Sequence, residues 1–197
     1  MTSLVLTWAL LAAPAGESPW THVDVVDGIT LQQRAVEGSK FVQLRLTTTT
    51  DVEVKRLCDA VFGTGRIEPG EPDIKSRVVI SETENERVTY EIISPPVASD
   101  RDYGARATRT QLPDGACRVT FEAANDLVPK SPEGFVRIEK LKGAWTFEHR
   151  ADGKTGIEYV IHTDPAGALP AFLVEGSRRR IAVRWVKLVI GWAKKAR

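Results

Sequence analysis

The sequence has few of the residues from which metal centres and nucleophilic active sites are built. Among its 197 residues are two cysteines and three histidines. His22, His149 and His162 have no second histidine four residues away and no cysteine or carboxylate at the spacing of a ligand pair, so we expect no metal and no cofactor. The sequence also lacks the motifs of P-loop proteins, dinucleotide-binding folds and many serine hydrolases, which excludes these common classes.

The two cysteines, Cys58 and Cys117, are too few to define a disulfide framework. Cys58 lies among residues with helical spacing and Cys117 lies in a segment with strand spacing, and both have apolar neighbours. We expect buried free thiols, although one disulfide is compatible with an exported protein. No base lies near Cys58 in the sequence, so nothing indicates an activated thiolate.

Acidic residues are missing from the C-terminal segment. From Gly176 to Arg197 there are eight lysines and arginines and no acid, whereas the whole chain has a net charge of +1. The basic residues are thus concentrated in one segment. This argues against general nucleic-acid binding and leaves contact with a local anionic surface open.

The N-terminus carries the pattern of a secretory signal. An apolar run of ten residues, Leu4 to Ala13, is followed by the small residues at Ala13 and Ala15. The run is too short to be a permanent membrane anchor. We expect residues 1–15 to be cleaved and the protein to be periplasmic or secreted. If the segment is not cleaved, a buried N-terminal helix and a cytoplasmic protein are the alternative.

The rest of the chain alternates between strand and helix periods. An extended segment at 29–34 is followed by Val42, Leu44 and Leu46, which alternate with polar residues as in a half-buried strand. A short helix is predicted from Asp51 to Gly63. The expected strands after it are 76–82, 87–94, 101–111, 116–124, 135–140, 144–150 and 155–163, with a turn at 141–143.

One long helix is expected at the C-terminus, after the run Asp164 to Pro170. Its apolar residues recur in two rows at helical spacing, Ile181/Trp185/Leu188/Trp192 and Ala182/Val186/Val189/Ala193. Its opposite side carries a cationic stripe, Arg180, Arg184, Lys187 and Lys194. Strands in hairpin order form an antiparallel sheet, so the pattern predicts an α+β fold with a curved sheet around one helix. A cavity is expected, because one helix cannot fill such a sheet.

Five segments, in the same order, resemble the START domain, the lipid-transfer domain related to steroidogenic acute regulatory protein. They are Trp20 with Asp27-Gly28-Ile29, Pro95 to Tyr103 (PPVASDRDY), Gly134 to Ile138 (GFVRI), Gly143 to Trp145 (GAW) and Tyr159 to Leu173 (YVIHTDPAGALPAFL). The resemblance covers residues 19–197. It implies a helix-grip fold, in which a curved antiparallel sheet holds the long C-terminal helix and encloses an apolar tunnel for one lipid.

The resemblance also implies roles for particular residues. Loop 125–133 is similar to the family's gating loop, so Leu127 and Val128 are expected to enter a bilayer during exchange. Glu91 matches an acid found in the family's sterol binders, but the position of its arginine partner is Ala107 here. The expected cavity residues are Glu91, Tyr103, Arg137, Trp145, Phe147, Tyr159, Phe172 and Leu173, each of which would also suit an ordinary core or surface position.

We therefore expect a monomer that binds a lipid or another hydrophobic small molecule and transfers it between membranes. We expect no nucleic acid among its partners. Arg180, Arg184 and Lys187 are expected to hold the tunnel mouth at an anionic membrane surface. Two alternatives stay open. One is an enzyme similar to polyketide cyclases and aromatases, which share the helix-grip shape, and the other is a module that binds a partner protein through the basic helix.

Overall fold

The computed structural model describes residues 18–63, 71–72, 74–95, 98–167 and 171–195, apart from the side chains of 171–173. The expected signal peptide, residues 1–15, lies outside the described residues. No helix in the described part of the chain has the length and hydropathy needed to cross a membrane.

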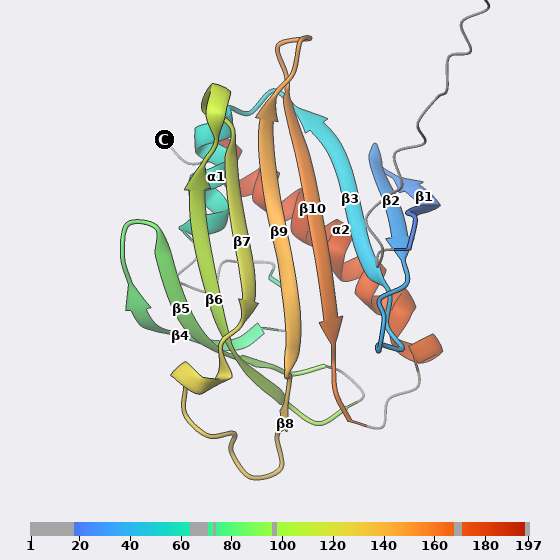
Figure 1. Cartoon of the computed structure of the whole chain (residues 1–197), viewed down its shortest axis with the longest axis vertical. Helices are drawn as coiled ribbons and strands as arrows, with labels where there is room; N and C mark the ends of the chain where they lie inside the picture. The colour runs from blue at the N-terminus through green and yellow to red at the C-terminus, as the bar shows by residue number, and fades with distance from the viewer. Residues whose placement is uncertain (1–17, 64–70, 73, 96–97, 168–170, 196–197) are drawn as a thin grey trace, which may run out of the picture.

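One curved sheet forms a layer of the molecule (Figure 1). The strand order is β1-β2-β3-β10-β9-β7-β6-β5-β4 with antiparallel neighbours, and the short strand β8 pairs with β6 in parallel. The strands are β1 Thr21–Val26, β2 Ile29–Arg34, β3 Gln43–Thr50, β4 Ile74–Glu82, β5 Glu86–Ile93, β6 Arg101–Gln111, β7 Cys117–Ala123, β8 Val136–Arg137, β9 Lys140–His149 and β10 Thr155–Asp164.

Two α-helices pack on the same face of this sheet. Helix α1 (Val54–Phe62) contacts β7, β9 and α2, and α2 (Ala171–Lys195) also contacts β3. Figure 1 shows α2 running behind β9, β10 and β3. We call the face of the sheet that carries the helices the inner face and the opposite one the outer face. Two short 3-10 helices, Pro113–Gly115 and Asn125–Leu127, lie in the connections on either side of β7.

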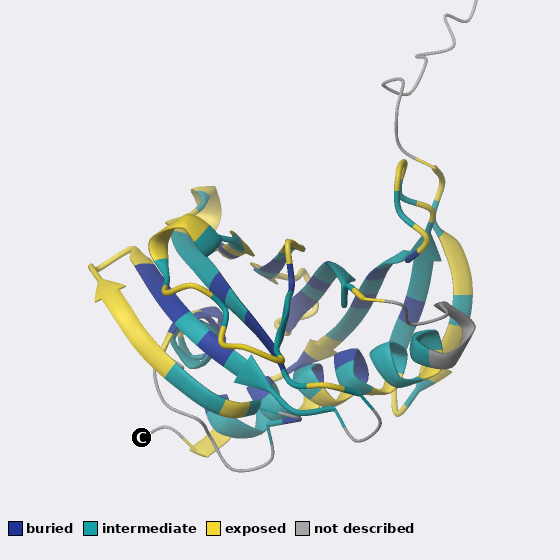
Figure 2. Cartoon of the chain, turned by 90° about the horizontal axis from the view of Figure 1, so that it is seen from below, coloured by how far each residue is buried: buried dark blue, intermediate teal, exposed yellow. Residues whose placement is uncertain are grey.

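The core lies between the inner face and the two helices. Successive side chains of a strand point to opposite faces, so every second residue of the central strands reaches this core. Figure 2 shows the buried positions on the sheet and on the helices. The sheet contributes Leu31, Leu44, Leu46, Val119, Trp145, Phe147, Ile157 and Tyr159, and α2 contributes Ala182, Val183, Val186, Val189 and Ala193.

The structure confirms the helix-grip fold of a curved, mainly antiparallel sheet and a long C-terminal helix. Of the two apolar rows of α2, the row from Ala182 to Ala193 is buried and the row from Ile181 to Trp192 is half-buried. The cationic stripe is exposed on α2, as expected from its spacing.

The expected turn at 141–143 is wrong, because β9 continues through it from Lys140 to His149. Gly143 lies inside β9, where its neighbours leave no room for a side chain. A Cβ there would overlap the ring of Phe121 and the carbonyl oxygen of Val160. The glycine thus marks a close approach within a sheet and not a change of chain direction.

The expectation of free thiols is also wrong. Cys58 of α1 and Cys117 of β7 form a disulfide, and both residues are buried in the core. The bond joins the first helix to the middle of the sheet across 59 residues of sequence. The pairing depends on how α1 packs against β7, which residue spacing does not reveal.

Candidate functional site

Three polar side chains lie next to one another on the inner face, where β4, β5 and β6 form one edge of the sheet. Arg77 is opposite Glu91, and Glu91 is opposite Tyr103. Opposed residues share a face of the sheet. Tyr103 is on the same side of β6 as Ala107, which packs against the core formed with α2. These three residues, the inner row, therefore face the interior.

Glu91 is the acceptor at the centre of the inner row. Arg77 donates to its Oε1 at 3.0 Å and to its Oε2 at 3.3 Å. The Thr89 hydroxyl donates to Oε1 at 3.0 Å, and the Tyr103 hydroxyl donates to Oε2 at 2.8 Å. Arg77 also donates two hydrogen bonds to Glu71, at 3.0 and 2.8 Å. Glu91 is 8% exposed, so it is a buried carboxylate whose charge is balanced by an arginine and satisfied by four hydrogen bonds.

Tyr103 and Arg77 of the inner row each keep one protonation state. Burial and the negative charge of Glu91 raise the pKa of Tyr103 well above its ordinary value, so this tyrosine remains a neutral donor. Burial opposes the charge on Arg77, but Glu91 and Glu71 outweigh it and raise the pKa of the guanidinium. Arg77 therefore remains a cation that is committed to two carboxylates.

Aromatic side chains from β7, β9 and β10 continue the inner face. Trp145 and Tyr159 are stacked with ring centroids 3.9 Å apart, and the ring centroid of Phe147 lies 6.0 Å from that of Trp145. Phe121 is 6.3 Å from Tyr159. Phe147 is fully buried and Trp145 is 5% exposed, so both are part of the core. Three of the four aromatic rings were expected in the cavity, and the structure brings them together.

Tyr159 of β10 is a buried core residue whose pKa responds to charge on α2. Burial raises its pKa, and the charge of Arg178 on α2 opposes that rise. Tyr159 also adds to the raised pKa of Tyr103. Arg178 itself donates to Glu175 at 2.7 Å and to the carbonyl of Val42 at 3.0 Å.

Arg137 does not join Glu91. It donates to Asp102 at 3.1 and 2.7 Å, and Asp102 also accepts from Ser131 at 2.6 Å and from Tyr90 at 2.9 Å. Asp102 precedes Tyr103 in β6, so its side chain points to the outer face. We call Asp102, Arg137, Tyr90 and Ser131 the outer cluster. It fixes the loop before β8 to the sheet.

Loop 125–133 lies against the outer side of β6. The Asn125 side chain accepts a hydrogen bond from the Gly104 backbone at 2.9 Å and donates one to the Ile138 carbonyl at 2.9 Å. A Cβ on Gly104 would come within 2.8 Å of the Val128 side chain, so Val128 packs against the strand. Leu127 is 39% exposed. Of the two residues expected to enter a bilayer, one is therefore half-buried and one is available at the surface.

The expected residues of α2 fall into two groups. Arg180, Arg184 and Lys187 are exposed, and Lys187 pairs with Asp27 in the turn between β1 and β2. The side chains of Phe172 and Leu173, two expected cavity residues, lie outside the described part of the structure.

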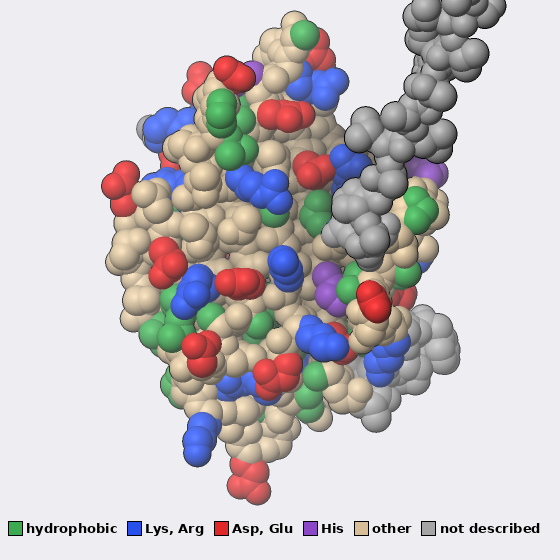
Figure 3. Space-filling view, in the orientation of Figure 1, with side chains coloured by type: hydrophobic (Ala, Val, Ile, Leu, Met, Phe, Trp, Pro, Cys, Tyr) green, Lys and Arg blue, Asp and Glu red, His purple; other side chains and the backbone are tan. Residues whose placement is uncertain are grey.

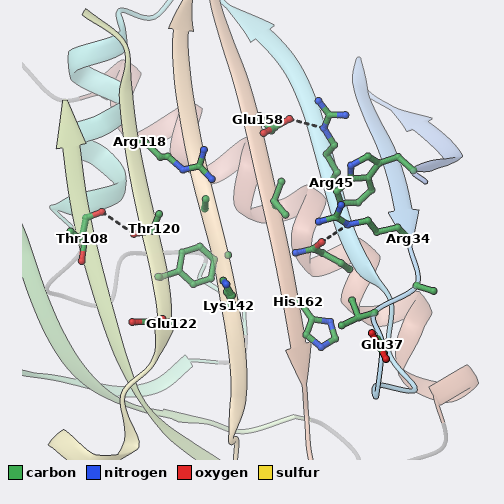
Figure 4. Close-up of a pocket in the computed structure, with 18 of the residues that line it drawn as sticks. Arg34, Glu37, Arg45, Thr108, Arg118, Thr120, Glu122, Lys142, Glu158 and His162 are labelled. Atoms are coloured by element: carbon green, nitrogen blue, oxygen red, sulfur yellow. Dashed lines mark hydrogen bonds and ion pairs between the residues drawn. The ribbon is translucent and has the colours of Figure 1, made fainter. Parts of the chain in front are cut away.

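A groove of about 920 Å³ crosses the outer face, away from the inner row (Figures 3 and 4). Trp20 lies at its side, with the Arg34 guanidinium 4.3 Å from the ring centroid, and Arg45 pairs with Glu158 at 2.6 Å. Acidic and basic side chains alternate across this face in Figure 3. Its charged lining is unlike that of an apolar ligand site. The basic side chains of the groove are Arg34, Arg45, Arg106, Arg118 and Lys142, and the acidic ones are Glu37, Glu122 and Glu158.

Within the described ranges no three histidine, cysteine or acidic side chains gather as metal ligands would. His162 is the one buried histidine among the described residues. It lies on the outer face and lines the groove, and burial lowers its pKa. The inner row is therefore made of arginine, carboxylate and hydroxyl groups that bind one another.

Sequence reasoning found Glu91 and Tyr103 but missed Arg77, which binds the carboxylates of Glu91 and Glu71. Counting back from the turn between β4 and β5 pairs Glu82 with Arg87 and would pair Glu91 with Val78. A register shift between Val79 and Ser81 brings Arg77 opposite Glu91 instead. A bulge has no reliable sequence signal, although a buried acid calls for a basic partner somewhere nearby.

The family model described as the START domain matches residues 76–189. An uncharacterised protein of Pseudomonas aeruginosa is 25% identical over 177 residues, which covers 88% of this chain and 86% of that protein.

Solved structures share the fold. A STAR-related lipid transfer protein fragment from Xanthomonas axonopodis matches with a TM-score of 0.79 and 25% identity, over 89% of this chain and 98% of that one. Human StAR-related lipid transfer protein 5 matches with a TM-score of 0.76 and 20% identity, over 93% of this chain and 88% of that one. An aromatase/cyclase from Streptomyces matches with a TM-score of 0.53 and 12% identity, over 78% and 93%, and this shows a shared fold alone.

Proposed function

Since the chain belongs to the START domain family, we propose that it takes up a lipid or a similar hydrophobic molecule between the inner face and α2 and transfers it between membranes. The observation that carries this proposal is the inner row, a set of polar groups buried in an otherwise apolar interior. Such a pattern suits a molecule with a long apolar body and a small polar end. The similarity to a STAR-related lipid transfer protein supports it.

We propose that the interior opens where β6 meets the turn before α2. Arg101, at the start of β6, is 3% exposed and donates to the carbonyl of Pro165 at 3.2 Å and to the carbonyl of Ser99. This one side chain therefore connects the loop before β6 to the turn that leads into α2. Loop 125–133 is fixed to the outer face, so we assign it a contact with the membrane through Leu127 and not the moving closure.

Contact with the membrane is proposed to be transient and to use the exposed stripe of α2. Arg180 and Arg184 have no acidic partner among the described residues, whereas Lys187 is paired with Asp27. Each free cation near an anionic bilayer contributes about 1 kcal/mol of attraction, which falls as salt rises. The protein is proposed to act as a monomer.

Export is proposed from two independent features. Residues 1–15 have the pattern of a cleaved signal, and the buried disulfide between Cys58 and Cys117 suits an oxidising compartment. Amino-terminal sequencing of the protein from its native host tests this point. A sequence that starts at Met1 would contradict cleavage.

We propose a binding protein and not an enzyme. Glu91 already accepts four hydrogen bonds, and the raised pKa values of Tyr103 and Tyr159 keep both hydroxyl groups protonated. A general base needs a free acceptor with a pKa near the working pH. The inward groups of the described residues are thus arranged to hold a ligand and not to take a proton from it.

The experiment is to incubate the protein with donor vesicles that carry a fluorescent phospholipid, add acceptor vesicles, and follow transfer. We expect transfer to rise with protein concentration and to fall for Arg180→Gln/Arg184→Gln at low salt. The matched control is Arg118→Gln/Lys142→Gln on the outer face, which should transfer normally. Transfer that does not depend on the protein would contradict the proposed function.

A further inference from the structure

The groove on the outer face has a regular floor that the pairing of the strands creates. Thr120, Ala144 and Val160 are opposite one another on β7, β9 and β10, and Thr108 of β6 is opposite Thr120. All four residues line the groove. The floor therefore consists of short, uncharged side chains, and its length across these strands is three strand spacings, about 14 Å.

A charged row borders this floor on each side (Figure 4). Glu122, Lys142 and His162 are opposite one another on β7, β9 and β10, two residues from the floor. Arg118 of β7 and Glu158 of β10 lie in the row on the other side, again two residues from the floor. Each row thus contains an acid and a base, so the groove offers hydrogen-bond donors and acceptors along both sides.

Four charged side chains of the groove are exposed and make no hydrogen bond or ion pair with another described residue. They are two bases, Arg118 and Lys142, and two acids, Glu37 and Glu122. The other charged side chains of the lining have partners, and these are Arg34, Arg45, Arg106 and Glu158. Free charges of the two signs are therefore present in equal number, which favours neither an anion nor a cation.

Two buried polar atoms of the lining lack a hydrogen-bond partner among the described residues, Nδ1 of His162 and Nε of Arg106. His162 is 9% exposed, and burial lowers its pKa, so the imidazole is neutral near pH 7. It also lines a second hollow of about 420 Å³, together with Glu37, Glu122 and Lys142. Buried polar atoms nearly always have a partner, so these two atoms point to polar groups that the described residues do not supply.

The surroundings of the groove argue against other classes of ligand. A peptide that adds a strand needs a free sheet edge, whereas this groove crosses the middle of the sheet. An apolar molecule would remove water from the charged rows without replacing its hydrogen bonds. An anion would meet Glu37 and Glu122, and a cation would meet Arg118 and Lys142. A neutral molecule rich in hydroxyl groups suits both rows, because each hydroxyl donates to a carboxylate or accepts from a base.

We propose that this groove is a second binding site, for a neutral oligosaccharide that lies along the floor and has about three sugar rings, as the length of the floor allows. Its hydroxyl groups bind Glu37, Glu122, Arg118 and Lys142, and Trp20 offers an aromatic ring at the side of the groove. The site goes beyond the proposed lipid function and lies on the opposite face of the sheet. A dissolved oligosaccharide and the head group of a glycolipid share this chemistry, but a head group of one ring would cover only part of the floor.

The test measures the binding of neutral trisaccharides in solution by isothermal titration calorimetry. Cellotriose, maltotriose, mannotriose and triacetylchitotriose are titrated into the full-length protein, and we expect at least one Kd below about 1 mM. The single sugar of that trisaccharide should bind at least about tenfold more weakly, as should the anion trigalacturonate. The affinity should change less than about twofold between low and high salt, because a neutral ligand carries no charge to be screened.

Variants of exposed residues locate the site without disturbing the core. Arg118→Ala and Glu122→Ala each remove one charged hydrogen-bonding group and should weaken the binding of the trisaccharide at least about tenfold. Arg150→Ala is the matched control, because Arg150 is exposed just after β9 and lies outside the groove. It should bind as the wild type does.

Lipid transfer provides the second comparison. Arg118→Gln/Lys142→Gln should lose trisaccharide binding and transfer lipid normally. Arg180→Gln/Arg184→Gln should bind the trisaccharide normally and transfer less lipid at low salt. The two activities therefore fail separately, since a protein without lipid transfer is still expected to bind the trisaccharide.

Four results would overturn the inference. The first is that none of the four trisaccharides binds. The second is that trigalacturonate binds more tightly or that affinity falls steeply with salt, which would show a site for an anion. The third is equal affinity for the single sugar, which would show a site for one ring, as in a glycolipid head group. The fourth is unchanged binding in both Arg118→Ala and Glu122→Ala, which would place the site elsewhere.

Discussion

Two neighbouring residues of β6, Asp102 and Tyr103, belong to clusters of similar composition on opposite faces of the sheet. The inner row joins Tyr103 to Glu91 and Arg77, and the outer cluster joins Asp102 to Tyr90 and Arg137. Each has a carboxylate, an arginine and a tyrosine. The outer cluster uses them to fasten a loop, whereas the inner row places them in the interior that α2 covers. The same chemistry therefore has a structural role on one face and a proposed binding role on the other.

The largest expected effect comes from removing the arginine of the inner row. Arg77→Ala leaves Glu91 and Glu71 without it, and losing one member of a buried ion pair costs about 3–5 kcal/mol. Urea unfolding measures the free energy of unfolding. The control is Arg45→Ala, because the pair with Glu158 is about one-third exposed on both sides and should change stability by less than about 1 kcal/mol. Equal losses in the two variants would contradict the assignment of Arg77 to a buried row.

Removing the arginine of the outer cluster should cost less. Arg137→Ala leaves Asp102 with its hydrogen bonds from Ser131 and Tyr90, so a loss of about 1–3 kcal/mol is expected. The loop before β8 should then be cut faster by protease. Lipid uptake should stay normal, since the cluster is on the outer face. Loss of uptake in a folded Arg137→Ala protein would show that this arginine acts as a ligand group after all.

Removing the tyrosine hydroxyl of either cluster should have a smaller effect on stability than removing its arginine. Tyr103→Phe and Tyr90→Phe each remove one hydrogen bond to a carboxylate, and each should lower the free energy of unfolding by about 1–2 kcal/mol. Only Tyr103→Phe should also reduce the amount of lipid that the protein takes from vesicles. If both variants reduced uptake equally, the two faces would not differ in function.

The smallest effect concerns pH. Burial opposes the charge on Asp102, but hydrogen bonds from Arg137, Ser131 and Tyr90 outweigh it and lower its pKa. A carboxyl group whose pKa is lower in the folded protein stabilises it above the unfolded value of about 3.9, and this contribution is lost as the pH falls through the folded value. The stability difference between wild type and Asp102→Asn should therefore be constant near neutral pH and shrink below about pH 4. A difference that stays constant down to pH 2 would contradict the shift.

Much of the fold could be predicted from the sequence, because the apolar spacing of the strands and of α2 reflects burial directly. The Ala182 to Ala193 row and the exposed stripe of α2 are where the helical period places them. Gly143 misled the prediction, since a glycine that accommodates Phe121 has the same sequence signal as a glycine in a turn. The disulfide depends on tertiary packing, which local patterns do not contain.

The site was only partly predictable for a similar reason. Glu91 and Tyr103 are on β5 and β6, which pair without a register shift, so their shared face follows from alternation. Arg77 reaches the same face through the bulge in β4. Arg137 lies in the two-residue strand β8, whose parallel pairing with β6 brings it beside Asp102, and no spacing rule links the two residues.

The most direct test of the account is to purify the protein from its native host, extract it with organic solvent and identify the extracted molecules by mass spectrometry. The account predicts about one lipid for each protein molecule in the wild type, with the same amount on Tyr90→Phe and less on Tyr103→Phe. An extract without lipid, from protein that is folded and that also fails to take lipid from vesicles, would contradict the claim that the inner face holds a lipid.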